Sequence, residues 1–227
     1  MTKKVVKNIE DTRRGKILLT AARLFIEQGY ENTGMRQIAE EAGVSLSLAS
    51  YHFGSKRVIG KKLILGHLRA IQPYVYELTS HDERLFSSTL LRVNYMLMNQ
   101  PHLKRFYEDT LLNDIYLDAL TGGNVEKEKQ RSLTRQQMFW VLSDSYIPVS
   151  MERAMVMCPF SDLLGMDVPE FITRYFMYHL SEEGKTLQHP PDWYVQKDKE
   201  LAEIILTQHP HLYHIFENIP QNVEQFI

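Results

Sequence analysis

Four side chains near the N-terminus have types and spacing that suit reversible hydrogen bonding to a polar or charged partner. Ser47 and Ser50 offer hydroxyl groups, Tyr51 a phenol and Lys56 an ammonium group. Hydroxyl groups both donate and accept hydrogen bonds, so they suit the polar edges of bases, whereas an ammonium suits phosphate. No local arrangement of serine, cysteine and histidine supports a nucleophile, so the pattern favours binding over covalent chemistry.

A helix must hold these side chains, and the sequence predicts one with a packed partner. Ser45 is expected to cap a helix that runs through Phe53, with Ala49 and Phe53 on its inner arc and the polar groups facing outward. A short helix is expected to start at Met35 and to end before Gly43, which permits a sharp reversal. This is helix-turn-helix geometry, in which the second helix presents exposed residues to the major groove.

A longer helix is expected to precede this pair. Apolar residues between Ile17 and Phe25 fall on one arc of a helical wheel, which predicts a helix from Thr12 to a stop at Gly29. Residues 1–10 carry lysines without a helical period and are expected to form a mobile arm.

The charge distribution points to the same region. Through Gln72 the chain has 13 Lys+Arg against 6 Asp+Glu, whereas the remainder has 13 against 22. The first third is therefore expected to meet a polyanion. Ser55 is expected to cap a fourth helix, which places Lys56 and free backbone amides where a phosphate can bind.

Composition limits the class of protein. The chain has 227 residues, and 44% of them are hydrophobic, enough to bury a core. Charges break every apolar run before the ~20 residues that span a bilayer, and no signal-peptide core is present, so a soluble cytoplasmic protein without membrane contact is expected. The single cysteine, Cys158, excludes an internal disulfide and is expected to be a buried structural thiol.

Cofactor and metal sites are not expected. The sequence has no glycine-rich phosphate loop and no zinc-protease motif. His209, His211 and His214 are close in sequence, but Pro210 separates the first two and no cysteine or carboxylate is near, which favours a surface cluster over a metal site.

Several of these segments together resemble the N-terminal domain of the tetracycline-repressor (TetR) family, over about Thr12 to Leu65. The resemblance implies an all-α homodimeric transcription regulator in which three N-terminal helices bind an operator. It also implies a helix-turn-helix domain over residues 1–55 and a larger helical effector-binding and dimerisation domain over residues 56–227. The segments that carry it are Thr12-Arg13, ILLTAARLFIEQGYENT, IA..AGVS from Ile38 to Ser45, and Tyr51-His52-Phe53 followed by Ser55-Lys56.

The resemblance also implies roles for single residues. Arg36 matches a site on the second helix that can reach a base, and a guanidinium can bond O6 and N7 of guanine together. Three positions match reading sites at the start of the recognition helix, and three later ones match contacts to the DNA backbone. The reading sites are Leu46, Ser47 and Leu48, the backbone sites are Tyr51, His52 and Lys56, and Ser45 is the cap.

This chain departs from the family pattern at three positions. Ser47 replaces a frequent glycine, Ala49 stands where leucine is usual, and Ser50 replaces a tyrosine that commonly contacts phosphate. These departures bear on the operator sequence and affinity and leave the binding mode intact. Specificity is expected to rest on Arg36, on methyl contacts and on DNA shape.

The middle of the chain is where a partly apolar small-molecule effector would be expected to bind. Helices are expected over Asp82–Asn99, from Pro101 onward, and over Val125–Tyr146 before a break at Pro148. Their aromatic and methionine side chains could line a cavity or simply fill the core. The candidate ligand-contacting residues are Tyr95, Tyr107, Phe139, Trp140, Tyr146, Met155 and Met157.

Two late helices are expected over Glu170–Glu183 and Trp193–Thr207. Their wide apolar faces could complete the domain core, and in the resembled family such helices pair with a second subunit. A two-fold dimer would match a palindromic operator. The candidate interface residues are Phe171, Tyr175, His179, Leu201, Ile204 and Ile205.

Three classes of function remain open from the sequence. The leading one is a ligand-responsive regulator, with repression as the expected direction. An enzyme that uses the N-terminal unit for targeting is the second, and a helical adaptor whose basic end binds an acidic protein is the third. Affinity for DNA that falls steeply with salt and keeps a preference for one palindrome would separate the first from the third.

Overall fold

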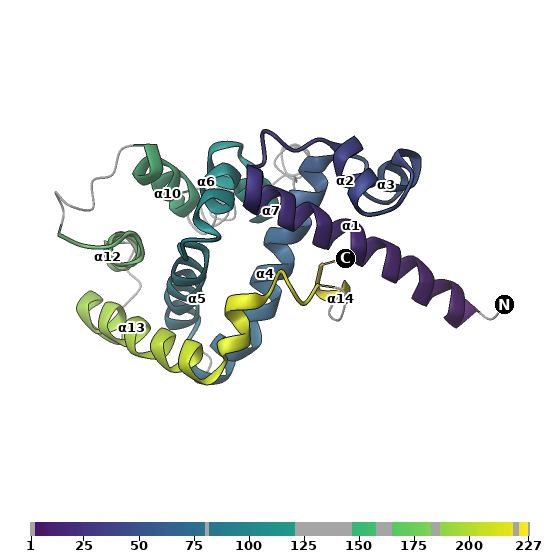
Figure 1. Cartoon of the computed structure of the whole chain (residues 1–227). Helices are drawn as coiled ribbons and strands as arrows, with labels where there is room; N and C mark the ends of the chain where they lie inside the picture. Colours follow the sequence, from purple (N-terminus) through teal and green to yellow (C-terminus); the bar gives the residue numbers. More distant parts are fainter. Residues whose placement is uncertain are drawn as a thin grey trace, which may run out of the picture. The chain divides into compact units, whose positions relative to one another are not determined.

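The computed structural model shows an all-α chain over the residues that it describes, with no strand among them (Figure 1), which confirms the expected fold class. Unit 1, one of two compact units, comprises Met1–Ala70, Gln100–Ala119 and His211–Ile227. Unit 2 comprises Ile71–Asn99 and Leu120–Pro210. The described residues are 3–79, 82–120, 147–157, 165–182, 187–219 and 223–226.

The first helix, α1, spans Lys3–Gln28 and is longer than the sequence predicts. The arm expected over residues 1–10 is therefore wrong. Residues 1–10 contain no proline or glycine that would interrupt a helix. The helical hydrogen bonds therefore continue upstream of Thr12, where the helix was expected to start. The C-terminal stop is confirmed, since Gly29 has φ +92° and its N–H donates to the Phe25 carbonyl at 3.1 Å.

The next three helices of unit 1 begin where the sequence predicts. The recognition pair consists of α2, Met35–Glu41, and α3, Leu46–Phe53, which pack against each other (Figure 1). The fourth helix, α4, spans Lys56–Thr79 and continues through Pro73, so its last residues belong to unit 2.

Unit 1 is completed by chain segments that lie far from the recognition pair in sequence. The helix expected from Pro101 begins at Lys104 instead. Unit 1 thus extends past the functional boundary predicted after residue 55, and that boundary stays a prediction. The additional elements are α6 (Lys104–Leu112), α7 (Ile115–Leu120), the 3-10 helix η2 (Pro210–His214) and α14 (Val223–Phe226).

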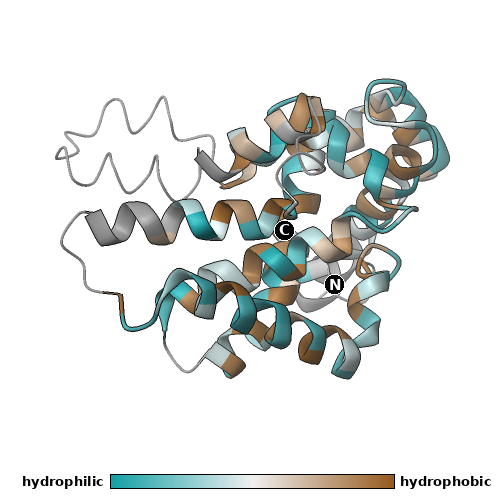
Figure 2. Ribbon diagram, turned by 90° about the vertical axis from the view of Figure 1, so that its left-hand side faces the viewer, coloured by the Kyte–Doolittle hydropathy of each residue, from teal (hydrophilic) through white to brown (hydrophobic). Residues whose placement is uncertain are grey.

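Unit 2 contains the helices predicted over Asp82–Asn99, Glu170–Glu183 and Trp193–Thr207, and a further helix over Ile147–Met157 that the sequence did not predict. Asp82 caps α5 by accepting hydrogen bonds from the backbone N–H groups of Arg84 and Leu85, both at 3.0 Å. Hydrophobic and hydrophilic residues are mixed along the helices (Figure 2), as in amphipathic helices that bury one face. The helices are α5 (Glu83–Met98), α10 (Ile147–Met157), α12 (Val168–Glu182) and α13 (Pro191–Gln208).

Some expectations fall outside the described residues. They concern the helix over Val125–Tyr146 and the environment of Cys158. Pro148 lies in the first turn of α10, where a proline is tolerated because its missing N–H has no partner in the helix. Within the described ranges, no helix combines the length and the apolar character that crossing a membrane requires.

Candidate nucleic-acid interface

The short helix α2 is held in place by its neighbours, since seven residues cannot form a stable helix alone. Ile38 and Ala39 are buried on its inner face. Gln37 adds polar contacts: its Oε1 accepts from Gln28 Nε2 of α1 at 2.7 Å, and its Nε2 donates to Glu41 at 3.0 Å. Glu41 also pairs with Arg23 of α1. The helix is therefore fixed against α1 before any partner binds.

The reversal between α2 and α3 has the geometry predicted from its glycine. Gly43 has φ +67°, a conformation that glycine adopts without strain. The N–H of Ala42 donates to the Ile38 carbonyl and that of Val44 to the Ala39 carbonyl, both at 3.0 Å, so the end of α2 is satisfied. Val44 is half-buried beneath the turn. This closure sets the direction in which α3 leaves.

The start of α3 is capped by Ser45, as predicted. Ser45 Oγ accepts a hydrogen bond from the Leu48 N–H at 3.2 Å and lies 2.9 Å from Ser47 Oγ. The cap thus also holds the hydroxyl of a predicted reading residue. Leu46 is 40% exposed, and Leu48 is half-buried.

The two faces of α3 separate as the wheel predicts. Ala49 is fully buried and Phe53 is only 4% exposed, whereas Tyr51 is 79% exposed. Ser47 and Ser50 are exposed as well. A surface of small hydroxyl groups and one aromatic ring can approach a major groove closely and bond to base edges.

Replacing Ser45 by alanine is expected to lower the free energy of unfolding by about 1 kcal/mol, because the Leu48 N–H loses its partner. Ser45→Asp, which keeps a capping oxygen, is the matched control and should retain most of the stability. Chemical unfolding of the three proteins checks this. Equal stability of wild type and Ser45→Ala would mean that the cap does not hold α3.

The other predicted contact residues differ in their exposure and in their hydrogen bonds within the protein. Arg36 is exposed on α2. His52 is half-buried, and its Nδ1 accepts from Arg14 Nε of α1 at 3.4 Å. Lys56 Nζ donates to the Tyr30 carbonyl at 2.9 Å and lies 4.2 Å from the centre of the Tyr30 ring. Lys56 therefore joins the start of α4 to the loop after α1 within the protein itself.

Two residues that position this interface were not predicted. Arg57 donates from Nε to Asp118 at 2.7 Å and from Nη1 to the Asn113 carbonyl at 2.8 Å, which ties the first turn of α4 to the α6–α7 segment. Asp109 of α6 accepts from the Tyr30 N–H at 2.7 Å. These partners lie 56 to 79 residues apart, so no local pattern reports them.

The predicted ligand residues lie in different parts of the chain, and their role stays a prediction. Tyr95 is half-buried in unit 2 against Val168 and Ile172, and burial raises its pKa. Tyr107 is buried in unit 1, with its ring edge on Tyr116 at 5.7 Å. Met157 is 70% exposed. Outside the described residues or side chains lie Phe139, Trp140, Tyr146 and Met155.

Several predicted dimer residues contribute to the core of unit 2. Leu201 is 5% exposed in a cluster with Leu85, Met177 and Tyr194, and Ile205 is fully buried. Their apolar surface is therefore used inside the chain, as expected if these helices complete the domain core, and their role in a dimer stays a prediction. The remaining candidates are Ile204, Phe171 and Tyr175, all half-buried, and His179, whose side chain is not described.

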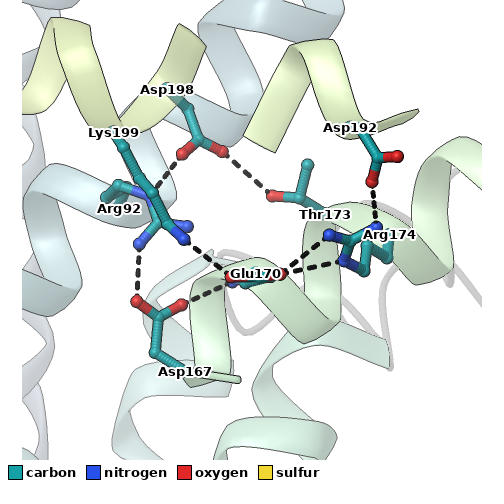
Figure 3. A network of polar contacts seen from close by, with 8 residues as sticks. All are labelled: Arg92, Asp167, Glu170, Thr173, Arg174, Asp192, Asp198 and Lys199. Atoms are coloured by element: carbon teal, nitrogen blue, oxygen red, sulfur yellow. Dashed lines mark hydrogen bonds and ion pairs between the residues drawn. The ribbon is translucent and has the colours of Figure 1, made fainter. Parts of the chain in front are cut away.

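A charged network joins three helices of unit 2 (Figure 3), and the sequence did not predict it. Arg92 of α5 is 3% exposed; its Nε bonds to Asp198 of α13, and its Nη1 bonds to Asp167 at 2.8 Å. Thr173 of α12 donates to Asp198 at 3.3 Å. Burial raises the pKa of Asp198 to about 6, although the Arg92 guanidinium acts in the opposite direction. One sequence signal was available: Arg92 lies seven residues after Leu85 on the buried arc of α5.

A second set of ion pairs borders this network. Glu170 of α12 accepts from Lys199 of α13 at 2.7 Å and from Arg174 at 2.8 Å. The Lys199 hydrogen bond is the main cause that lowers the pKa of Glu170. Arg174 also pairs with Asp192 (Figure 3). Within the described part of the chain, no three histidine, cysteine or acidic side chains gather as metal ligands would.

The N-terminal part of this chain is similar in sequence to known proteins. Residues 17–59 match the family model of bacterial regulatory proteins of the tetR family. The HTH-type transcriptional activator FasR of Mycolicibacterium smegmatis is 37% identical over 79 residues, which cover 35% of this chain and 33% of that protein. The HTH-type transcriptional repressor KstR2 of Mycobacterium tuberculosis is 38% identical over 58 residues, or 26% of this chain and 29% of that protein.

The matched part is limited in length. The alignments span about a third of the curated relatives. A crystal structure from Shewanella sp. PV-4, described as a candidate tetR family transcription regulator, aligns over 93% of this chain and 97% of that one, with 17% identity and a TM-score of 0.36. The similarity is thus to the N-terminal helix-turn-helix domain of tetR family regulatory proteins, and it covers residues 17–59 of this chain in the family model.

Proposed function

We propose that this protein is a transcription regulator that binds operator DNA through α3 and the start of α4. The observation that carries the proposal is the separation of the two faces of α3 within the family-matched segment. Ala49 and Phe53 are buried against the unit, while Ser47, Ser50 and Tyr51 are exposed. A rigid helix with a polar outer face at a fixed turn is what major-groove recognition requires.

In this proposal, different residues on and around α3 contact different parts of the DNA. Arg36 and Ser47 read base edges, Leu46 contacts thymine methyl groups, and Tyr51 contacts the sugar-phosphate backbone. The exposed side chain of Leu46 supports its role. Because serine discriminates weakly among bases, DNA shape contributes to specificity.

The proposal extends to assembly and control. We infer a homodimer on a palindromic operator, because two copies of α3 related by a two-fold axis read two half-sites. Unit 2 would bind a small, partly apolar effector that changes the affinity for DNA. The similar proteins include a transcriptional activator and a transcriptional repressor. Of these two modes of regulation, we propose repression for this protein.

Footprinting on the DNA that flanks the protein's own gene tests the proposal. The expected result is one protected palindrome with half-sites about one helical turn apart. A promoter reporter carrying that palindrome should be silenced when the protein is expressed. No protected region at any salt concentration would contradict operator binding, and an activated reporter would overturn repression alone.

Arg36→Ala and Lys56→Ala are expected to affect binding differently. Arg36→Ala should reduce the preference for the operator over altered palindromes by about 1–3 kcal/mol, because a bidentate base contact is lost. Lys56→Ala should weaken all DNA alike and reduce the salt dependence by about one phosphate contact. Anisotropy titrations on operator and scrambled duplexes measure both.

Thermal unfolding must accompany the Lys56 variant, because Lys56 also bonds to the Tyr30 carbonyl. Lys61→Ala on α4 is the matched control for the loss of one positive charge. If Arg36→Ala weakened every duplex equally while Lys56→Ala changed base preference, the division of roles would be reversed.

A further inference from the structure

The C-terminal end of the chain is part of the unit that contains the helix-turn-helix. We define residues 211–219 together with α14 as the C-terminal strap. This segment belongs to unit 1, and α14 packs against α1. Its apolar side chains are almost fully withdrawn from solvent. They are Leu212, Ile215, Phe216, Ile219 and Phe226.

Phe216 contacts aromatic rings on α4 and α6, and a third helix, α1, is reached through Phe106. Its ring stacks on His67 of α4, with centroids 5.7 Å apart and planes 17° apart. It also meets Phe106 of α6 edge-on at 5.6 Å, and Phe106 stacks on Phe25 of α1 at 6.0 Å. A continuous row of aromatic rings thus runs from the strap to the helix against which α2 packs.

Phe226 packs against α4 at Gly66. Its ring lies against the backbone of Gly66, so that a Cβ at that position would overlap the ring. Glycine inside a helix lowers helix stability, so a glycine here calls for a reason. The Phe226 ring supplies that reason, because only glycine at position 66 leaves room for the ring against the α4 backbone. Gly66 and Phe226 therefore form one lock.

The strap also continues directly from unit 2. Helix α13 ends at Gln208, and η2 leads from it into the strap. The chain passes between the units in α4 as well, after Ala70. The first of these two chain connections is α4 itself. The second leads into the strap, whose Phe216 and Phe226 contact α4 within unit 1.

We propose that the C-terminal strap positions α1 and α4 for DNA recognition, so that operator affinity depends on whether the strap is docked. This rests on the proposed function for its DNA-binding part. With the lock closed, α1 and α4 present α3 in the binding geometry. With the lock open, the same helices fluctuate, and binding must first restore their order.

The test uses the full chain with Phe226→Ala, Gly66→Ala and the double variant, and Glu224→Ala on the exposed side of α14 as the matched control. Hydrogen exchange should show faster exchange in α1 and α4 for both single variants and not for the control. Operator affinity should fall about fivefold or more, within the usual range of coupling between sites. Circular dichroism fixes a temperature at which all variants are folded.

The double variant makes the test specific for the lock. Without the ring, the methyl group at position 66 no longer overlaps anything, so adding Gly66→Ala to Phe226→Ala should cause little further loss. Additive losses would contradict a shared contact. If Phe226→Ala does not fold, Phe226→Leu keeps apolar contact without the ring and takes its place.

The outcomes separate this inference from the proposed function. Unchanged hydrogen exchange in α1 and α4 of the variants would contradict the proposal that the strap positions these helices. Faster exchange with unchanged operator affinity in folded protein reduces the strap to a stabilising segment and overturns its role in recognition. If the wild-type chain prefers no DNA sequence, the proposed function fails, and the recognition role of the strap fails with it.

Discussion

Replacing Arg92 by methionine is expected to lower the free energy of unfolding by about 3–5 kcal/mol at pH 7, because Asp198 loses the cation that offsets the cost of burying its charge. Asp198 is fully buried, and besides Arg92 it is contacted by Thr173 at 3.3 Å. Chemical unfolding followed by circular dichroism measures the loss. Lys197→Met on the surface of α13 is the matched control and should change stability little.

The loss in Arg92→Met should shrink as the pH falls. Burial already raises the pKa of Asp198 from 3.8 to about 6, so the native state holds this proton more tightly than the unfolded state. A group of this kind contributes stability below its unfolded pKa and loses that contribution as the pH rises through its folded pKa. Without Arg92 the carboxyl protonates still more readily. The variant should therefore lie closer to wild type at pH 5 than at pH 7.

Removing both charges provides the second control. Arg92→Met combined with Asp198→Leu should recover much of the stability, since a buried ion pair can often be exchanged for packed apolar groups. A double variant as unstable as Arg92→Met would contradict the explanation from an unpaired buried charge, as would a loss that is equal at pH 5 and pH 7.

Phe53→Ala is expected to cost about 3–5 kcal/mol in stability, because Phe53 is 4% exposed and anchors α3 to its unit. Specific DNA binding should be lost with it, since the reading helix loses its support. Tyr51→Ala, two residues earlier, should leave stability within about 0.5 kcal/mol, because that side chain is 79% exposed. It should nevertheless weaken operator binding.

The comparison tests the assignment of the two faces of α3. Unfolding curves and anisotropy titrations on the same protein preparations separate stability from binding. A large stability loss in Tyr51→Ala, or full operator affinity in folded Phe53→Ala, would show that the faces are wrongly assigned.

Local chemistry explains what could be predicted from the sequence. The cap at Ser45, the reversal at Gly43 and the stop at Gly29 each depend on the properties of one residue and its near neighbours. Helical periodicity gave the buried positions Ala49 and Phe53 for the same reason. These features predict which face of α3 is exposed.

Long-range packing explains what could not be predicted. Arg92 meets Asp198 across 106 residues, and Arg57 meets Asp118 across 61. A helical wheel shows that a helix has an apolar face and does not show what covers it. Leu201 illustrates this, because its apolar surface packs inside unit 2. The packing of the strap cannot be predicted either, because no periodic pattern marks its short segments.

The central claim is that the exposed face of α3 recognises a DNA sequence. The most direct measurement is the affinity of the full chain for the palindrome beside its own gene relative to a scrambled duplex, at physiological salt. The account predicts a ratio of about 10³ or more, with both affinities falling steeply as salt rises. A ratio near one at every salt concentration would contradict sequence recognition by this protein.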